Sequence, residues 1–301
     1  SPEFFLVSRL VGPQDKTALA LIDTFGNETI VYEEPELGCF DPMPLAQRTR
    51  PLELPMNRDF ENQKGSFYVY DVYQGSVMGA VPRGTVKYLR VVESPEKRFW
   101  TNPSWDGQGV HCPAMNWHGF ENKRVLGTVP VEADGSAYFE APADTFLYFQ
   151  LLDERKMMIQ SMRSGTIVQS GETQGCVGCH DERLGETAPT GHLPSAMRRP
   201  PNPLLAPNSS TEILNYLADI QPIFDRNCVE CHDFGKPAGE KLLLAGDKTL
   251  AFNASYIDLW SGGYLSSVGG GPAQILPAYS WGAHQSRLIQ TLISGHAHQP
   301  V

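Results

Sequence analysis

The first 45 residues carry short apolar stretches separated by turn signals. The stretches FFLVSRL, ALALIDTF and ETIVYEE are rich in apolar and β-branched residues, and a Gly-Asn dipeptide separates the second from the third. This pattern predicts a small antiparallel β unit over residues 1–45. Residues 46–65 are polar and contain two prolines, a composition typical of a linker.

A second region of strand signals runs from Ser66 to about Ser170. Several of its segments alternate apolar and polar residues, which is the period of a strand with one buried face. The segments are SFYVYDVY, TVKYLRVVE, RVLGTVPVE, SAYFEAPA, FLYFQLLD and MMIQSMRS. They predict a β-sandwich-like domain. The insert from Ser94 to Asn122, rich in Trp, Gly, Asn and Pro, is too irregular for a strand, and we expect it to lie over a site.

The pattern becomes helical in the last third of the chain. The segment TEILNYLADIQPIFDRN places apolar residues at helical spacing, with Thr211 as its predicted N-cap and Cys228 at its end. The segment SRLIQTLIS predicts an amphipathic helix that stops at Gly295. The predicted organisation is therefore a mainly β part followed by a small all-α domain. Its regions after the linker are a β-rich domain at 66–185, a Pro-rich tether at 186–209 and a helical domain at 210–301.

Charge and hydropathy exclude several classes of protein. The chain has 24 Lys plus Arg against 34 Asp plus Glu, a net charge of -10, which argues against nucleic acid as a partner. It has no apolar run near the roughly 20 residues that span a bilayer. The first ten residues lack the charged start and long apolar stretch of a signal peptide, so we expect that residue 1 is not the start of the gene product.

Four of the six cysteines fall in two CxxCH strings, CVGCH at 176–180 and CVECH at 228–232. The composition predicts only roughly 0.003 such strings by chance in this chain. Covalent haem attachment requires two thiols that reach the two vinyl groups of one porphyrin. It also requires a histidine beside the second thiol, so that the imidazole stands under the iron. Both strings meet these requirements.

The two strings therefore predict two c-type haems. The first would be attached to Cys176 and Cys179 with His180 as the proximal iron ligand, and the second to Cys228 and Cys231 with His232 as the proximal ligand. A competing interpretation is zinc, because paired CxxC strings also bind that metal. Zinc sites do not need a histidine directly after each second cysteine, so the pattern favours haem.

Several residues are candidates for the sixth ligand of each iron. For the second haem, His296 directly follows the last predicted helix, and His298 and His284 are alternatives; each of them can instead be an exposed polar residue. For the first haem the distal candidates are His118, His192 and Met197.

Two weaker patterns involve the remaining cysteines. His111, Cys112 and His118 can form a small metal site, such as an additional zinc, although this spacing is unspecific. Cys39 and Cys112 can instead pair as a disulfide, if the fold brings their Cα atoms within about 7 Å.

Three stretches carry a family resemblance. They are NWHGFENKRVLGTVPVEADGSAYFEAPADTFLYFQLLDERKMMIQSMRSGTIVQSGETQGCVGCHDER, DIQPIFDRNCVECH and PAYSWGAHQSRLIQTLISGH. Together they resemble the C-terminal half of hydrazine synthase alpha-subunit-related dihaem c-type cytochromes. The resemblance implies that residues 1–45 are the remnant of a last β-propeller blade. It further implies a β-rich domain with the first haem, a cytochrome c domain with a bis-histidine second haem, and an incomplete C-terminus at Val301.

One position departs from the family pattern. In hydrazine synthase a tyrosine four residues after the first motif histidine binds the iron, while that histidine turns to a zinc. The corresponding residue here is Leu184. Because leucine cannot ligate iron, we expect His180 to be an ordinary proximal ligand.

These observations leave two main functional hypotheses. The first is a dihaem cytochrome that transfers electrons between its haems and an external redox partner, or other subunits of a multihaem complex. The second is a haem oxidoreductase acting on a small nitrogen or oxygen compound at the first haem, with Asp106, His118 and Glu121 available for proton transfer. A zinc-bearing binding module is a minor third. Because haem is attached to CxxCH outside the cytoplasm, we expect a periplasmic or extracellular bacterial protein.

Overall fold

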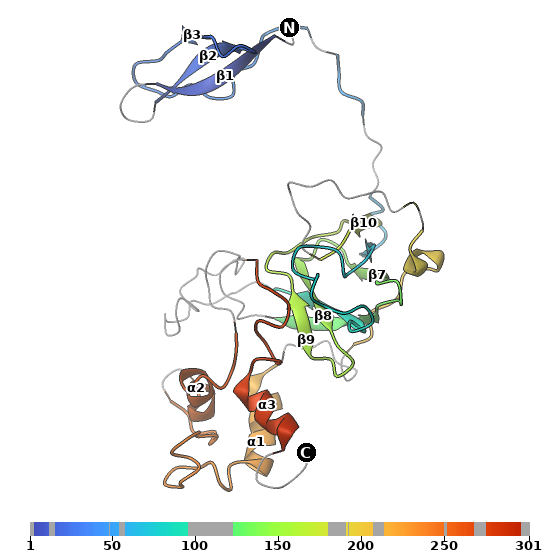
Figure 1. Cartoon of the computed structure of the whole chain (residues 1–301), viewed down its shortest axis with the longest axis vertical. Coiled ribbons are helices and arrows are strands. Elements are labelled where there is room, and N and C mark those ends of the chain that lie inside the picture. Colours follow the sequence, from blue (N-terminus) through green and yellow to red (C-terminus); the bar gives the residue numbers. More distant parts are fainter. Residues whose placement is uncertain are drawn as a thin grey trace. The chain divides into compact units, whose positions relative to one another are not determined.

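The chain divides into two compact units, Ser1–Met56 and Asn57–Val301, and the division falls within the segment 46–65 (Figure 1). The structure, a computed structural model, describes residues 3–11, 16–47, 49–53, 58–95, 123–179, 191, 193–206, 214–249, 252–267 and 275–295. None of the helices in these ranges has the length and apolar character needed to cross a bilayer.

The first unit contains one antiparallel sheet in the order β1-β2-β3. Its strands are β1 (Phe4–Val11), β2 (Lys16–Asp23) and β3 (Glu28–Tyr32). Asp23 shapes the turn between β2 and β3, since its carboxylate accepts hydrogen bonds from the N–H groups of Phe25 (2.9 Å) and Asn27 (2.8 Å). The predicted antiparallel unit is thus confirmed.

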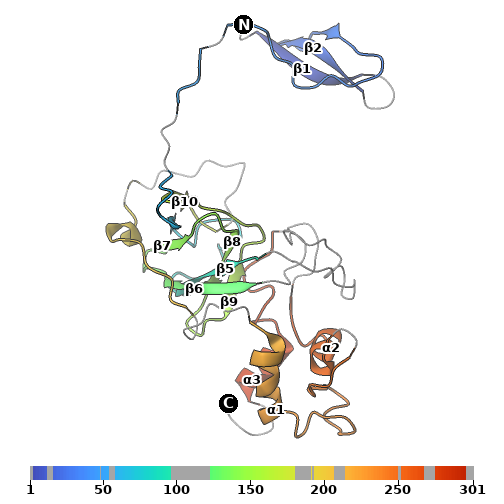
Figure 2. The ribbon, with the colours of Figure 1, turned by 180° about the vertical axis from the view of Figure 1, so that it is seen from behind.

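The second unit begins with two sheets, which have the orders β10-β4-β7 and β6-β5-β8-β9. The strands are β4 (Lys64–Val69), β5 (Tyr88–Glu93), β6 (Arg124–Pro130), β7 (Ala137–Pro142), β8 (Leu147–Leu152), β9 (Met158–Ser161) and β10 (Thr173–Cys176). Figure 2 shows the four-stranded sheet from behind. The six predicted strand segments are confirmed. The short parallel strand β10 was not predicted.

The two sheets share one hydrophobic core. Along β7 the side chains alternate, so that Ala137, Phe139 and Ala141 are buried between more exposed neighbours. Phe139 lies 5.9 Å from Phe67 of β4 and 5.4 Å from Phe149 of β8, measured between ring centroids. This aromatic cluster packs the two sheets against each other.

Part of the predicted Pro-rich tether is packed on the β-rich part. The 3-10 helix η1 (Ser195–Arg198) begins at Ser195, whose backbone N–H donates to Asp134 Oδ2 (2.8 Å). Ala196, within η1, is fully buried. Isolated bridges pair Leu205 with Thr128 of β6, and Asn202 with Phe139 of β7. Residues 193–206 therefore pack against β6 and β7 of the β-rich part.

The last part of the chain contains the π-helical turn η3 (Tyr216–Ile220) and three short helices, α1 (Gln221–Asn227), α2 (Ala254–Ser261) and α3 (Arg287–Ser294). A mainly β part followed by a small region with three short helices matches the predicted order of elements. The predicted end of the last helix at Gly295 is confirmed by its positive φ of 88°. Phe224, Leu242, Leu244 and Leu259 form the core of this region.

The start of the first helical segment differs from the prediction. Asn215 caps it, because its side chain accepts hydrogen bonds from the N–H groups of Leu217 and Ala218. The backbone of Asn215 is extended, so the helical segment begins after this residue rather than at the predicted cap, Thr211, which lies outside the described residues. Helix α2 was also not predicted; Asn253 caps it by accepting from Tyr256 N–H (3.3 Å).

Candidate functional site

The second CxxCH string continues helix α1 as a helical turn. The N–H of Cys228 donates to Phe224 O (2.8 Å), and the N–H groups of Cys231 and His232 both donate to Cys228 O, over 3.1 and 2.9 Å. Residues at positions i, i+3 and i+4 of such a turn share one face. The two thiols and the imidazole therefore project to one side, as attachment to a single porphyrin requires.

The ring of His232 is oriented by the backbone. Its Nδ1 lies 2.8 Å from the carbonyl oxygen of Leu242. Because a carbonyl only accepts, Nδ1 must carry the proton of the neutral ring, which places the lone pair on Nε2. The N–H of Leu244 donates to His232 O (2.9 Å) and fixes the same segment. This arrangement fits a metal-ligating histidine, whose other nitrogen donates to a carbonyl.

The second pair of thiols lies at the edge of the helical core. Cys228 packs against the cluster that contains Phe224 and Leu242, while Cys231 is exposed. Burial raises the pKa of the Cys228 thiol. Leu288 of α3 packs against the same cluster. The thiols and the imidazole of this site thus share one helical turn, while the apolar cluster beside them also includes residues distant in sequence.

The first CxxCH string lies in an extended segment. Cys176 ends strand β10 and pairs in parallel with Val69 of β4. Beyond the strand, the N–H of Asp71 donates to Val177 O (3.0 Å), and the N–H of Cys179 donates to Gln74 O (2.9 Å). The segment 176–179 is thus held along residues 69–74. His180, the predicted proximal ligand, lies outside the described residues.

Gly178 permits this close approach. A Cβ atom at this position would lie 2.4 Å from the carbonyl oxygen of Gln74, which no other residue type can accommodate without a shift of the backbone. The corresponding residue of the second string is Glu230. The residue between the cysteines is therefore set by the surroundings of each string.

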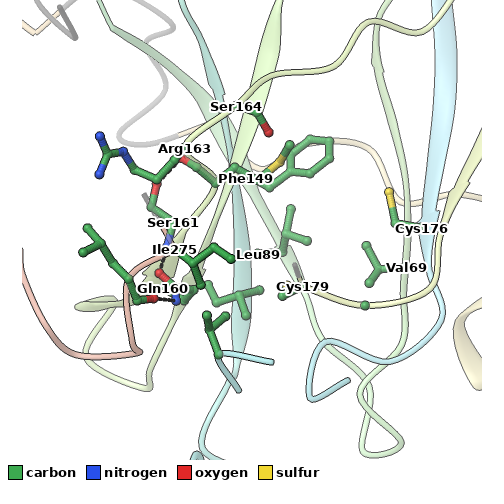
Figure 3. A pocket seen from close by; sticks show the side chains of 15 residues that line it. Val69, Leu89, Phe149, Gln160, Ser161, Arg163, Ser164, Cys176, Cys179 and Ile275 are labelled. Carbon is green, nitrogen blue, oxygen red and sulfur yellow. Dashed lines mark hydrogen bonds between the residues drawn. The ribbon is translucent and has the colours of Figure 1, made fainter. Parts of the chain in front are cut away.

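A cavity of about 340 Å³ adjoins the first pair of thiols. This volume lies in the range of small-molecule pockets, roughly 300–1,000 Å³. Apolar side chains predominate in the lining, which consists of Val69, Val77, Leu89, Phe149, Leu151, Met162, Ile275 and Leu276 together with Gln160, Ser161, Arg163, Ser164, Cys176, Gly178 and Cys179 (Figure 3). An apolar cavity beside two thiols fits the faces of a porphyrin.

The electrostatic surroundings keep both thiols neutral. Burial, together with the nearby Cys176 and Asp71, raises the pKa of the Cys179 thiol to about 12. Burial also raises the pKa of Cys176. Among the described residues, no group of three or more His, Cys, Asp or Glu side chains is arranged to hold a metal ion.

Residues far along the chain complete the cavity. The side-chain amide of Gln160 donates to Leu276 O (2.8 Å), and the N–H of Tyr279 donates to Ile159 O (2.8 Å), so that the segment after residue 275 runs along β9. Ile275 and Leu276 form part of the lining. Neither residue was predicted as a site residue, because no periodic pattern in the sequence indicates this pairing.

Two of the predicted distal ligands are described. Met197 is half-buried in η1, and the lining of the cavity, as far as the chain is described, does not include it. His284 places Nε2 at 3.1 Å from Asp153 Oδ2, and its ring meets that of Tyr279 at 5.0 Å between centroids. Met162, which was not predicted, places a thioether side chain in the lining of the cavity.

The remaining predicted residues lie outside the described ranges. They are His111, Cys112, His118, His192, His296 and His298, together with Leu184, Asp106 and Glu121. Cys39 is half-buried in the first unit. Its pairing with Cys112 and the weak metal site of His111, Cys112 and His118 therefore stay predictions.

Comparison with known proteins supports the family resemblance for part of the chain. Residues 84–181 match the family model of the hydrazine synthase alpha subunit middle domain. The structure is similar to that of Kuenenia stuttgartiensis hydrazine synthase, with a TM-score of 0.61 and 16% sequence identity, over 99% of this chain and 49% of that chain. This chain thus spans about half the length of that protein. No curated protein sequence matches the chain.

Proposed function

We propose, from the premise that residues 84–181 are a hydrazine synthase alpha subunit middle domain, that this chain is a dihaem c-type cytochrome. It would transfer electrons between its two haems and an external redox partner. The observation that carries the proposal is that both CxxCH strings place thiols against an apolar core, the first beside a cavity of about 340 Å³.

Each side chain of the strings has a role in this proposal. Cys176 and Cys179 would hold the first haem, and Cys228 and Cys231 the second, by thioether bonds. His180 and His232 would be the proximal ligands, and the contact of His232 Nδ1 with Leu242 O (2.8 Å) directs Nε2 to that task. Bound haem supplies a one-electron redox couple whose potential the surrounding protein sets.

The sixth ligands remain part of the proposal. For the second haem we propose His296, with His298 and His284 as alternatives; the contact of His284 with Asp153 favours His296 or His298 over it. For the first haem, His118, His192 and Met197 are the candidates from sequence. Met162 joins them, because its thioether lines the cavity and thioethers ligate haem iron.

The finer architecture is proposed on the same basis. Residues 1–45 would be the remnant of a propeller blade, residues 66–185 a sandwich-like domain and residues 210–301 a cytochrome c domain. Exposed apolar side chains on the first sheet support the first of these, since Phe4 and Phe5 are 53% and 54% exposed. Partners would be a redox protein and other subunits of a multihaem complex, in the periplasm or outside the cell.

A second candidate function is a haem oxidoreductase that acts on a small nitrogen or oxygen compound. The match of residues 84–181 to the hydrazine synthase alpha subunit middle domain favours it. In this case the first haem would have an open coordination position, and the second would supply electrons.

The dihaem proposal is tested by intact mass and by the haem absorption spectrum in alkaline pyridine. The parent chain is expected to carry the mass of two haems. The variants Cys176→Ala/Cys179→Ala and Cys228→Ala/Cys231→Ala are each expected to carry one. A colourless parent chain with the mass of the bare polypeptide would contradict the proposal.

Carbon monoxide distinguishes the two candidate functions. If each iron has two protein ligands, as the electron-transfer proposal predicts, carbon monoxide added to the reduced protein is expected to leave the absorption spectra of both haems unchanged. Binding at one haem supports the oxidoreductase. The Cys176→Ala/Cys179→Ala variant is the control, because it must abolish any such signal if the open iron is the first one.

A further inference from the structure

The cavity beside the first CxxCH string has two chemically different ends. Figure 3 shows Cys176, Cys179 and Val69 at one end and Gln160, Ser161 and Arg163 at the other. Phe149 and Leu89 lie between them. The cavity is thus apolar along its length and polar at the end away from the thiols.

Arg163 is the one charged side chain among the described residues of this lining. It follows strand β9 and is half-buried. Desolvation by burial lowers the pKa of its guanidinium, but arginine keeps its charge at all pH values of interest. The guanidinium therefore lies at the polar end of the cavity, and Figure 3 shows it directed away from the two cysteines.

A c-type haem has the same division. Its vinyl groups are on one side of the ring and its two propionate carboxylates on the other. Once the vinyl groups are attached at Cys176 and Cys179, the carboxylates must point to the end that carries Arg163. Arginine is well suited to carboxylates, because its planar guanidinium can donate two parallel hydrogen bonds.

We propose that Arg163 is the anchor of a haem propionate at the first site, where Ser164 also lines the cavity. This inference rests on the proposed function and deepens it, since it assigns the orientation of the first haem. It makes Arg163 a positioning residue and a determinant of the redox potential: a positive charge near the ring stabilises the reduced, more electron-rich state.

The test is a potentiometric titration of the dihaem chain, fitted to two one-electron steps. The step of the first haem is assigned with the Cys228→Ala/Cys231→Ala variant. In Arg163→Gln, the midpoint potential of the first haem is expected to fall while that of the second stays unchanged. Arg163→Lys, which keeps the charge, is expected to show a smaller shift and serves if Arg163→Gln does not fold.

A pH series adds a readout that a merely structural role would not move. A nearby cation lowers the pKa of a carboxylate. Without Arg163, the propionate is expected to protonate at higher pH, so the rise of the midpoint potential on acidification begins at higher pH than in the parent. Arg155→Gln is the matched control, because it removes the same charge from an exposed turn before β9.

The outcomes distinguish a failure of the Arg163 assignment from the absence of the first haem. The inference is overturned if Arg163→Gln moves the first potential no further than Arg155→Gln does. It is also overturned if Arg163→Gln only weakens binding of added nitrite and leaves the potential and its pH dependence unchanged, because the cation would then serve an anionic substrate. A peptide map without haem at Cys176 and Cys179 would instead refute the proposed function.

Discussion

The same five-residue motif, CxxCH, occurs in two different frameworks in this chain. The second string is a helical turn in which the backbone N–H groups of Cys228, Cys231 and His232 donate at most four positions back, such as His232 N–H to Cys228 O. The first is extended, and its hydrogen bonds join residues that are distant in sequence, such as Tyr70 N–H to Cys176 O (2.8 Å). The second string is therefore shaped locally, whereas the first depends on the folded sheets.

Burial follows the same division. The first pair of cysteines packs against the core that both sheets share, and Cys231 of the second pair is exposed. The comparison teaches that CxxCH specifies attachment chemistry, while the surrounding fold specifies burial and the residue types between the cysteines. We therefore expect mutations around the first string to cost more folding free energy than matched mutations around the second.

The largest difference is expected for aromatic residues near the two strings. Phe149 is 7% exposed, lines the cavity and contacts two other phenylalanines, so Phe149→Ala should lower the free energy of unfolding by about 3–5 kcal/mol. Phe234, two residues after the second string, is 59% exposed, and Phe234→Ala should change it by less than about 0.5 kcal/mol. Urea unfolding followed by circular dichroism measures both. Equal losses of unfolding free energy in the two variants would contradict the expected difference between the strings.

A smaller difference is expected between the cysteines themselves. Gly178→Ala places a Cβ atom 2.4 Å from Gln74 O and should destabilise the protein by about 1–3 kcal/mol. Glu230→Ala, at the corresponding position of the second string, should be within about 0.5 kcal/mol of the parent. The haem content of each variant reports whether the strain also impairs attachment. A neutral Gly178→Ala would show that Gln74 can move aside.

The smallest effect is expected from acid. Burial acts to raise the pKa of Asp134, but hydrogen bonds from Ser136 and Ser195 outweigh it and hold the pKa well below its usual value. Such a carboxylate contributes stability above the unfolded pKa of about 3.9 and loses it as the pH falls below that value.

Asp134→Asn should therefore lower stability at pH 7, with a difference from the parent that shrinks below about pH 4. Hydrogen exchange should locate the loss in residues 193–206, which Asp134 holds through Ser195 N–H (2.8 Å). Glu240→Gln, an exposed change in the helical region, is the control. A constant difference at all pH values would contradict the role of the carboxylate charge.

Periodicity predicted strands such as β7 well, because alternate residues of β7 are buried. Apolar and β-branched stretches between turn signals predicted others, including β3, which is exposed throughout, and β9, which is buried throughout. It missed β10, whose sequence TQGC carries no apolar alternation and forms a strand only because β4 offers an edge. It also missed α2, a short helix that depends on the Asn253 cap. The stretch at 193–206 was predicted to be a tether because of its proline content. No sequence pattern indicated that it pairs with β6 and β7.

The candidate site divides in the same way. The positions of the thiols were evident from the two strings, because attachment chemistry requires a fixed local spacing. The cavity was not, since it combines β4, β5, β8 and β9 with Ile275 and Leu276. The roles of Met162 and Arg163 also depend on that tertiary arrangement, and no local motif distinguishes them from ordinary strand-end residues.

The contribution of Ile275 and Leu276 to the cavity makes it sensitive to truncation of the chain. A chain cut before residue 275 would keep the ten strands of the described residues but would lose these two side chains of the lining. It would also lose the hydrogen bond from the Gln160 side-chain amide to Leu276 O. The cavity beside Cys176 would then be open on that side, although every strand around it is intact.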